Sequence, residues 1–317
     1  MKVVLFGADG QVGSSLLELF RDDFDWICPK RKQFGGDLLC PEAVYRYLLR
    51  ELAGLKPVRE GIYLWRGDIT TLRCDAIVNA AAFTAVDKVP VYFHEAQTIN
   101  AEAPAFMARA ASELRAYFVH LSTDYVFNGN GEKAWKESDL KNPINAYGKT
   151  KAKGEDLVLK HNSQALILRL SWLHAAGHLN FVSSFCKRLQ EQSEVSVVTD
   201  QWGSPTSARD VAEVINLLLN QFKNGTPFQG IYHFANQGFC SRYECAQYIL
   251  RVLKKAGISW ALNKNIVSAK TADYPSLEPR PLNCRLDTEK LYSQLPIAPR
   301  PWQEALDATL SHYCQKI

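Results

Sequence analysis

An α/β fold with a doubly wound parallel sheet is predicted by the alternation of strand and helix patterns along the chain. Five short apolar runs have the length of buried strands, at residues 2–6, 26–28, 76–80, 117–121 and 166–170. Segments in which apolar residues recur with helical spacing separate them, at residues 12–20, 41–53, 93–114 and 146–161. This alternation is typical of parallel sheets covered by helices on both faces.

The second half of the chain shows a looser pattern. After about residue 172 turn-forming residues become frequent, although Ser241 and Glu244 still mark the start of a helix with a capping-box pattern. We therefore expect a first domain over residues 1–171. A smaller C-terminal α/β domain over residues 172–317 should return some segments to the first.

A glycine-rich turn connects the first predicted strand to the first predicted helix. Residues 7–13 read GADGQVG. Glycines let the chain turn sharply and let a pyrophosphate approach the backbone, while the helix N-terminus supplies free N–H groups and a positive dipole end. The triplet alone also fits a turn without a ligand. Its place between a strand and a helix favours a nicotinamide dinucleotide and a Rossmann-like fold.

The residues after the second predicted strand bear on the choice of dinucleotide. An acidic residue there would favour the free ribose hydroxyls of NAD, but residues 28–32 read CPKRK. Lys30 and Arg31 could pair with the 2′-phosphate of NADP. A solvated loop explains these cations equally well. We favour NADPH, with NADH as the alternative.

Tyr147 and Lys151 form a candidate catalytic pair. They lie four residues apart at the start of a predicted helix, so both side chains can face one cleft. A nearby ammonium stabilises a phenolate and lowers the phenol pKa from about 10. The spacing also occurs by chance, but Thr123 lies at the carboxyl end of a predicted strand, where open sheets bind ligands. We expect Tyr147 to protonate a ketone that Thr123 holds.

Composition excludes several other classes of protein. The 317 residues are 47% hydrophobic and 22% charged, and the net charge of +4 forms no basic stripe for nucleic acid. No segment approaches the ~20 apolar residues of a membrane span, and no signal-peptide pattern is present. Eight cysteines are scattered without a C-x-x-C pair, which fits a reducing compartment. We expect a cytoplasmic enzyme that binds neither nucleic acid nor membrane.

The assembled motifs resemble the extended short-chain dehydrogenase/reductase superfamily, and within it the family of dTDP-4-dehydrorhamnose reductases. The likeness covers most of the chain, at residues 6–13, 78–82, 84–88, 122–127, 147–151, 171–172, 200–206 and 280–283. It implies NAD(P)H-dependent reduction of the C4 ketone of a dTDP-linked 6-deoxy-4-ketosugar. The substrate it favours is dTDP-4-dehydro-L-rhamnose, with dTDP-L-rhamnose as the product.

The resemblance also implies roles for individual residues. The catalytic residues are Thr123, Tyr147 and Lys151. The cofactor-binding residues are Gly7, Gly10, Gln11, Val12, Gly13, Lys30, Arg31, Asp37, Leu38, Ala80, Ala81, Ala82, Tyr147 and Lys151. The substrate-binding residues are Val86, Asp87, Lys88, Thr123, Trp172, Arg280 and Asn283, with Arg280 as a diphosphate clamp. Taken singly, Trp172 could instead be a core residue, and Asp87 and Lys88 a surface pair.

The chain departs from the family pattern before the third strand. The stretch between Pro57 and Asp75 is longer, which indicates an insertion at about 58–74. Residues 64–79 resemble the opening of an ADP-ribose-binding macrodomain, but the glycine-rich loops expected next are missing. Asp37 and Asp68 are therefore rivals for the adenine contact, and we prefer Asp37 because the residues after it also match the family.

Two further expectations concern assembly and rival functions. Some family members dimerise through a metal held by glutamates, one of them on the first helix, where this chain has Ser14 and Ser15. We expect no metal and leave a homodimer open. A reductase of another dTDP-4-ketosugar stays an alternative, as does a non-catalytic NADP-binding regulatory subunit. A dehydratase is disfavoured, because Thr123 is not followed by the acidic pair of those enzymes.

Overall fold

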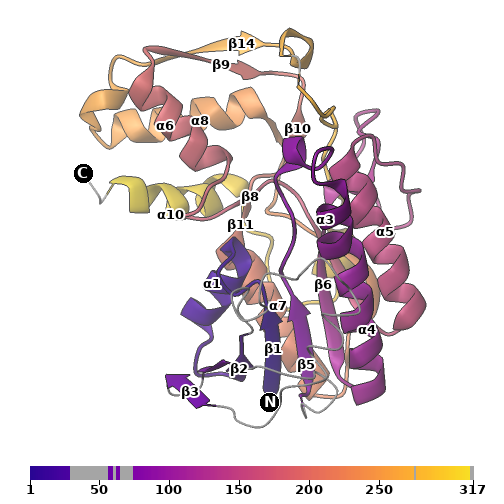
Figure 1. Ribbon diagram of the computed structural model, residues 1–317. Helices are drawn as coiled ribbons and strands as arrows, with labels where there is room; N and C mark the ends of the chain where they lie inside the picture. The colour runs from indigo at the N-terminus through magenta and orange to yellow at the C-terminus, as the bar shows by residue number, and fades with distance from the viewer. Residues whose placement is uncertain (29–55, 60–61, 65–73, 275, 315–317) are drawn as a thin grey trace.

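The computed structural model describes residues 1–28, 56–59, 62–64, 74–274 and 276–314 (Figure 1). The predicted helix at 41–53 lies outside these ranges. So do five residues with predicted roles at the cofactor: Lys30, Arg31, Asp37, Leu38 and Asp68.

The central element is an eight-stranded sheet in the order β12-β7-β6-β5-β1-β2-β4-β3. Seven of its strands run parallel: β1 (Lys2–Phe6), β2 (Asp25–Ile27), β4 (Ile62–Leu64), β5 (Ala76–Asn79), β6 (Tyr117–Thr123), β7 (Leu166–Leu170) and β12 (Gly230–Phe234). The eighth, β3 (Lys56–Arg59), pairs antiparallel with β4 at the edge. The predicted doubly wound parallel sheet is confirmed, and β4 lies within the expected insertion.

Helices cover both faces of the sheet, because alternate strand residues point to opposite sides. Val3 and Leu5 of β1 pack in a core with α1 (Gln11–Leu19) and α7 (Ala208–Lys223). Val4 and Phe6 pack in a second core with α4 (Ala103–Leu114) and α5 (Ala146–His161). Figure 1 shows these two helical layers on either side of the strands.

The predicted helix at 93–114 is interrupted. It consists of α3 (Phe93–Gln97), a π-helical turn η4 (Thr98–Glu102) and α4. Inside the turn, the Asn100 side chain donates to the Phe83 carbonyl at 3.1 Å and to Thr150 Oγ1 at 3.0 Å. A β-carbon at Gly154 would collide with the Asn100 carbonyl oxygen. The extra residue of the turn therefore lets the helix bend where it meets α5.

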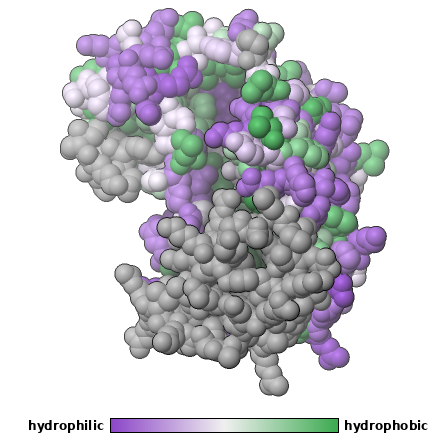
Figure 2. Space-filling model, in the orientation of Figure 1, coloured by the Kyte–Doolittle hydropathy of each residue, from purple (hydrophilic) through white to green (hydrophobic). Residues whose placement is uncertain are grey.

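The C-terminal lobe has its own core. It contains α6 (Phe181–Glu191), β9 (Glu194–Val198), α8 (Arg242–Lys255), β14 (Asn265–Ala269) and α10 (Trp302–Cys314), which lie above the sheet in Figure 1. The predicted capping box at α8 is confirmed, with Ser241 N donating to Glu244 at 2.7 Å. The visible surface of this lobe is mainly hydrophilic (Figure 2). In the described ranges, no helix has the length and apolar character of a membrane span.

A buried ion pair connects α5 to the sheet. Arg169 of β7 donates to both carboxylate oxygens of Glu155, at 2.9 and 2.8 Å, and Ser122 of β6 donates to the same carboxylate at 2.6 Å. The Arg169 and Glu155 side chains are 1% and 0% exposed. Each buried charge is stabilised by the other, because neither side chain is accessible to water.

Replacing Arg169 should therefore destabilise the protein strongly. We expect Arg169→Met to lower the free energy of unfolding by about 3–5 kcal/mol, because it leaves the Glu155 carboxylate buried with one fewer cation. Arg209→Met is the matched control, since Arg209 faces Glu213 on the exposed side of α7 at 3.9 Å and its loss should cost under about 1 kcal/mol. Urea denaturation measures both losses. Equal losses in the two variants would contradict this account.

Candidate active site

The glycine turn lies at the switch point of the sheet. The chain leaves β1 toward β2 on one side and resumes at β5 on the other, so β1 and β5 stay paired while the connections that follow them run to opposite sides. In open α/β sheets this arrangement forms the ligand crevice. Gly7 has a φ of +79°, and a β-carbon there would lie 2.6 Å from the Ala81 nitrogen. A β-carbon at Gly13 would collide with the Gly7 carbonyl oxygen. Both positions therefore exclude side chains.

The turn forms a cradle suited to a pyrophosphate. Helix α1 begins at Gln11 directly after Gly10, and its first turn contains no acidic residue. Gly10 adopts an extended conformation and offers no side-chain cap, so among the described residues no side chain caps the first N–H groups of this helix. Uncapped N–H groups and the positive helix end attract anionic oxygens. Ala80, Ala81 and Ala82 follow β5 directly, and the backbone of the first two lies against Gly7.

The structure places the three predicted catalytic residues at the carboxyl end of β6. Thr123 ends that strand, Tyr147 lies in the first turn of α5, and Lys151 follows one turn later. Burial raises the pKa of the Tyr147 phenol, as does the charge of Asp124, whereas a hydrogen bond with Thr123 lowers it. The phenol is therefore protonated near neutral pH and touches the threonine hydroxyl.

Lys151 is buried beside β6. Its side chain is 1% exposed, and its ammonium nitrogen donates to the Leu121 carbonyl at 2.7 Å. Burial lowers the Lys151 pKa to about 8, although the Glu155 carboxylate opposes this shift. A lysine that is half protonated near pH 8 can exchange protons under ordinary conditions.

Asp124 orients Thr123, a contact that the sequence analysis did not predict. Its carboxylate accepts hydrogen bonds from Thr123 Oγ1 at 2.8 Å and from Ser171 Oγ at 2.9 Å. Burial raises the Asp124 pKa, and these two hydrogen bonds lower it in part. The sequence could have indicated this contact, because Asp124 directly follows Thr123. The contact of Ser171 with Asp124 could not be predicted, because 47 residues separate the two.

The predicted substrate residues of the early segment meet a residue from near the C-terminus. Val86, Asp87 and Lys88 form a single 3-10 turn, η3 (Val86–Lys88). The Arg280 guanidinium donates to the Asp87 carboxylate at 2.7 Å. The two motifs of the resemblance therefore come together, and the candidate diphosphate clamp already holds a carboxylate partner.

Trp172 lies in a stack of side chains between the lobes. It has a positive φ of 43°, a strained conformation for a bulky residue. A β-carbon at Gly203 of β10 (Trp202–Gly203) would lie 2.5 Å from its indole ring. The Arg242 guanidinium carbon lies 3.5 Å from the Trp172 ring centroid and 4.7 Å from that of Phe181. The sequence analysis did not single out Arg242, because its aromatic partners Trp172 and Phe181 are close in space but far away in the sequence.

Asn283 is engaged within the protein. Its side-chain amide donates to the Lys133 carbonyl at 2.7 Å, and its backbone N–H donates to the Gly129 carbonyl at 3.0 Å. Its side-chain oxygen accepts from the Arg285 backbone at 3.2 Å. The side chain is 1% exposed, so it shapes the segment that carries Arg280.

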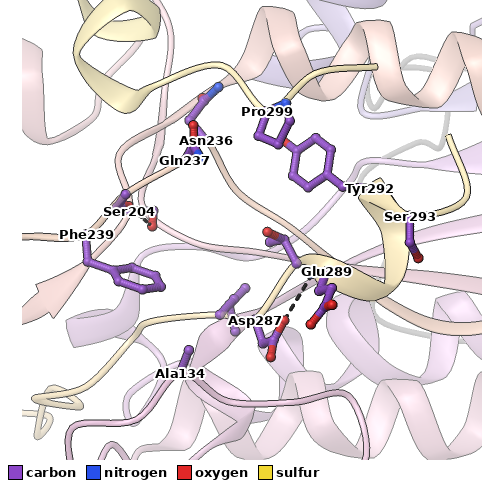
Figure 3. A pocket seen from close by; sticks show the side chains of 13 residues that line it. Ala134, Ser204, Asn236, Gln237, Phe239, Asp287, Glu289, Tyr292, Ser293 and Pro299 are labelled. Carbon is purple, nitrogen blue, oxygen red and sulfur yellow. Dashed lines mark hydrogen bonds between the residues drawn. The ribbon is translucent and has the colours of Figure 1, made fainter. Parts of the chain in front are cut away.

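A separate cavity of about 570 Å³ lies away from these residues (Figure 3). It is lined by segments 236–239 and 286–289, together with Ser204 and Tyr292. Its polar groups largely bond within the protein, since Ser204 donates to the Gly238 carbonyl and Tyr292 to the Ala235 carbonyl. It contains none of the predicted site residues. Within the described ranges, no cluster of three histidine, cysteine or acidic side chains is placed to hold a metal.

Comparison with known proteins identifies the family of the chain. The family model described as the RmlD substrate binding domain matches residues 1–315. The chain belongs to this family. It is 34% identical over 313 residues to the dTDP-4-dehydrorhamnose reductase of Escherichia coli K12, covering 98% of this chain and 97% of that one. It is 35% identical over 305 residues to the spore coat polysaccharide biosynthesis protein SpsK of Bacillus subtilis, covering 96% and 95%.

Solved structures of the same family share the fold. The dTDP-4-dehydrorhamnose reductase of Bacillus anthracis, in complex with NADP, has a TM-score of 0.81 and 28% identity, with 98% of each chain covered. The Clostridium acetobutylicum enzyme of that name has a TM-score of 0.81 and 28% identity, covering 98% of this chain and 99% of that one. The family resemblance predicted from sequence is confirmed.

The low pKa of Lys151 leads to a prediction for stability. Its pKa is about 8 in the folded protein and 10.5 for an ordinary lysine, so the unfolded state binds the proton more tightly and the buried ammonium destabilises the protein below pH 8. Lys151→Met should therefore raise the free energy of unfolding at pH 7 by about 1–3 kcal/mol, while abolishing activity. The gain should vanish as the pH approaches 10.5. Denaturant titrations at about pH 7 and pH 10 test this, and a gain independent of pH would contradict it.

Proposed function

We propose that the protein is an NADPH-dependent reductase that converts dTDP-4-dehydro-L-rhamnose to dTDP-L-rhamnose. The observation that carries the proposal is the placement of Lys151, buried one helical turn beyond a phenol that lies beside Thr123. Family membership and the named activity of the relatives supply the substrate. NADPH is proposed because the related Bacillus anthracis structure contains NADP, with NADH as the alternative.

The residues at the switch point fit a dinucleotide. We propose that Gly7, Gly10, Gln11, Val12 and Gly13 hold its pyrophosphate, since side chains are excluded there and the first turn of α1 is uncapped. Ala80, Ala81 and Ala82 would border it, and Lys151 would donate to its ribose. When bound, the cofactor supplies a hydride to the substrate carbon.

The protein itself supplies the proton and the orientation. Tyr147 donates its phenolic proton to the ketone oxygen as that oxygen gains negative charge. The single hydroxyl proton of Thr123 is donated to Asp124 in this structure, so Thr123 would turn this proton to the same ketone oxygen when the substrate binds. Ser171 holds the Asp124 carboxylate in place. The Tyr147 pKa is raised by burial and by Asp124, which differs from the lowering by Lys151 that the sequence led us to expect. The phenol is therefore fully protonated before the ketone oxygen gains charge.

The two lobes divide the remaining work. We propose that residues 1–171 form the cofactor-binding domain and residues 172–317 mainly the substrate domain, with α7 and β12 returning to the sheet. The sugar nucleotide would lie between Val86–Lys88 and the segment of Trp172, Arg280 and Asn283. We place the enzyme in the cytoplasm and leave its oligomeric state open.

Tyr147→Phe tests the mechanism. The variant should lower kcat by about 10²–10⁴-fold, because the proton donor is lost while the ring remains. NADPH affinity, measured by cofactor fluorescence, should stay within about twofold. Tyr117→Phe is the matched control, since Tyr117 is buried at the other end of β6, where its hydroxyl donates to the Phe228 carbonyl. It should keep its turnover.

Turnover is measured as the loss of absorbance at the reduced-nicotinamide band. The substrates are dTDP-linked 4-ketosugars of different stereochemistry. Wild-type protein that binds NADPH but reduces none of them would refute the proposed reaction. Faster turnover of another ketosugar would replace the substrate while keeping the chemistry. Unchanged turnover in Tyr147→Phe would refute the role of the phenol.

A second prediction concerns the cations between the lobes. We propose that the planar guanidinium of Arg242, stacked on Trp172, binds the diphosphate together with Arg280. Arg242→Gln should therefore raise the KM for the nucleotide sugar by about tenfold. Arg251→Gln is the control, because Arg251 lies on the same helix α8 and over the ring of Tyr248. Steady-state kinetics at constant ionic strength measure both. An unchanged KM in Arg242→Gln would contradict the assignment.

A further inference from the structure

A chain of three buried polar groups leads from the cofactor crevice to Lys151. Asn79 ends β5, and its side-chain oxygen accepts from the Ala81 backbone N–H at 3.1 Å. Its side-chain nitrogen lies 3.0 Å from Nδ1 of His120 on β6. Nε2 of His120 lies 3.4 Å from the Lys151 side-chain nitrogen. Asn79, His120 and Lys151 are each no more than 1% exposed.

The hydrogen-bond partners determine which nitrogen of the His120 ring carries the proton. The Ala81 N–H can only donate, so it fixes the Asn79 oxygen toward itself and turns the amide NH₂ toward His120. An NH₂ group cannot accept, so Nδ1 of His120 must accept with its lone pair. The neutral ring therefore carries its proton on Nε2. Burial lowers the His120 pKa well below its usual value, and the neighbouring Lys151 lowers it further, so the ring is neutral.

This tautomer faces Lys151 with a donor. An ammonium has three N–H donors and no acceptor, so it cannot form a hydrogen bond with the His120 N–H, which is also a donor. A neutral amine has a lone pair and can accept from that N–H. The ring therefore favours the deprotonated form of Lys151, in the same direction as burial, which lowers the Lys151 pKa to about 8.

The other charged groups near Lys151 act in both directions. Glu155, one turn further on α5, favours the ammonium, but its carboxylate is already bound to Arg169 at 2.8 Å and lies 3.3 Å from Lys141. Tyr147 on α5 and Asp124 of η5 (Asp124–Val126) act on each other, and neither is among the groups that shift the Lys151 pKa. Of the described side chains, His120 is the one within hydrogen-bonding distance of the Lys151 nitrogen.

We propose that Asn79 and His120 are positioning residues that hold Lys151 at the balance between its ammonium and amine forms. Asn79 locks the ring tautomer, and the ring then presents its N–H to the lysine. The inference rests on the proposed function, in which the Lys151 ammonium donates to the cofactor ribose. Loss of the His120 donor should make Lys151 retain its proton to higher pH.

The test measures NADPH affinity against pH without any sugar substrate. In the wild type, affinity should fall with a midpoint near pH 8, as Lys151 loses its proton. In His120→Gln, the side-chain oxygen can accept from the ammonium, so the midpoint should rise by about one pH unit, the value of one hydrogen bond. In His120→Phe, which removes the donor and adds no acceptor, it should rise by less.

His174→Gln is the matched control. Like His120, His174 of β8 (Leu173–His174) is buried, at 2% exposed, and burial lowers its pKa. It bonds at 3.0 Å to Thr309 of α10, whereas His120 contacts Lys151 of α5. Its substitution should leave the midpoint unchanged. Thermal unfolding checks that each variant is folded, and either His120 variant suffices for the test.

An unchanged or lowered midpoint in a folded His120 variant would overturn the inference, as would an equal rise in His174→Gln. The proposed reaction fails separately. Wild-type protein that binds NADPH with this pH profile but does not reduce the ketosugar would remove the reaction and leave the role of His120 intact.

Discussion

The burial of one ammonium group determines the organisation of the site. Lys151 lies between β6 and α5, where the Leu121 carbonyl holds its nitrogen. The same helix carries Tyr147 toward the crevice and Glu155 toward the sheet, and the Glu155–Arg169 ion pair fixes α5 against β7. A charge so placed destabilises the fold, and the ion pair behind it keeps the helix in position. Two residues one turn apart on α5 therefore have opposite effects on stability: Lys151 lowers it and Glu155 supports it.

Local patterns were sufficient to predict most of the sheet and the placement of Tyr147 and Lys151 on one helix. The boundaries of β1, β7 and α5 agree with the sequence prediction, because apolar runs and helical spacing are properties of consecutive residues. The glycine turn was predictable for the same reason, since it directly joins β1 to α1. The spacing of Tyr147 and Lys151 is likewise local. Family resemblance added the sugar nucleotide, which no local pattern contains.

Contacts between distant residues were beyond such patterns. The π-helical turn at Thr98–Glu102 arises where Asn100 bonds to Thr150 and meets Gly154, so residues 93–114 alone predict one continuous helix. The hydrogen bond from Ser171 to Asp124 and the stacking of Arg242 on Trp172 also join separate segments. The tautomer of His120 depends on a backbone N–H that follows another strand. Each of these features needs the fold before its chemistry can be read.

The protonation of Lys151 can be observed directly. Protein labelled with ¹³C at the lysine Cε positions reports each lysine by NMR as the pH is raised, and Lys151→Met assigns the signal. The account predicts a midpoint near pH 8 for Lys151, far below the 10.5 of an ordinary lysine side chain. A midpoint near 10.5 would contradict it, because the buried ammonium would then be no more acidic than a lysine in water.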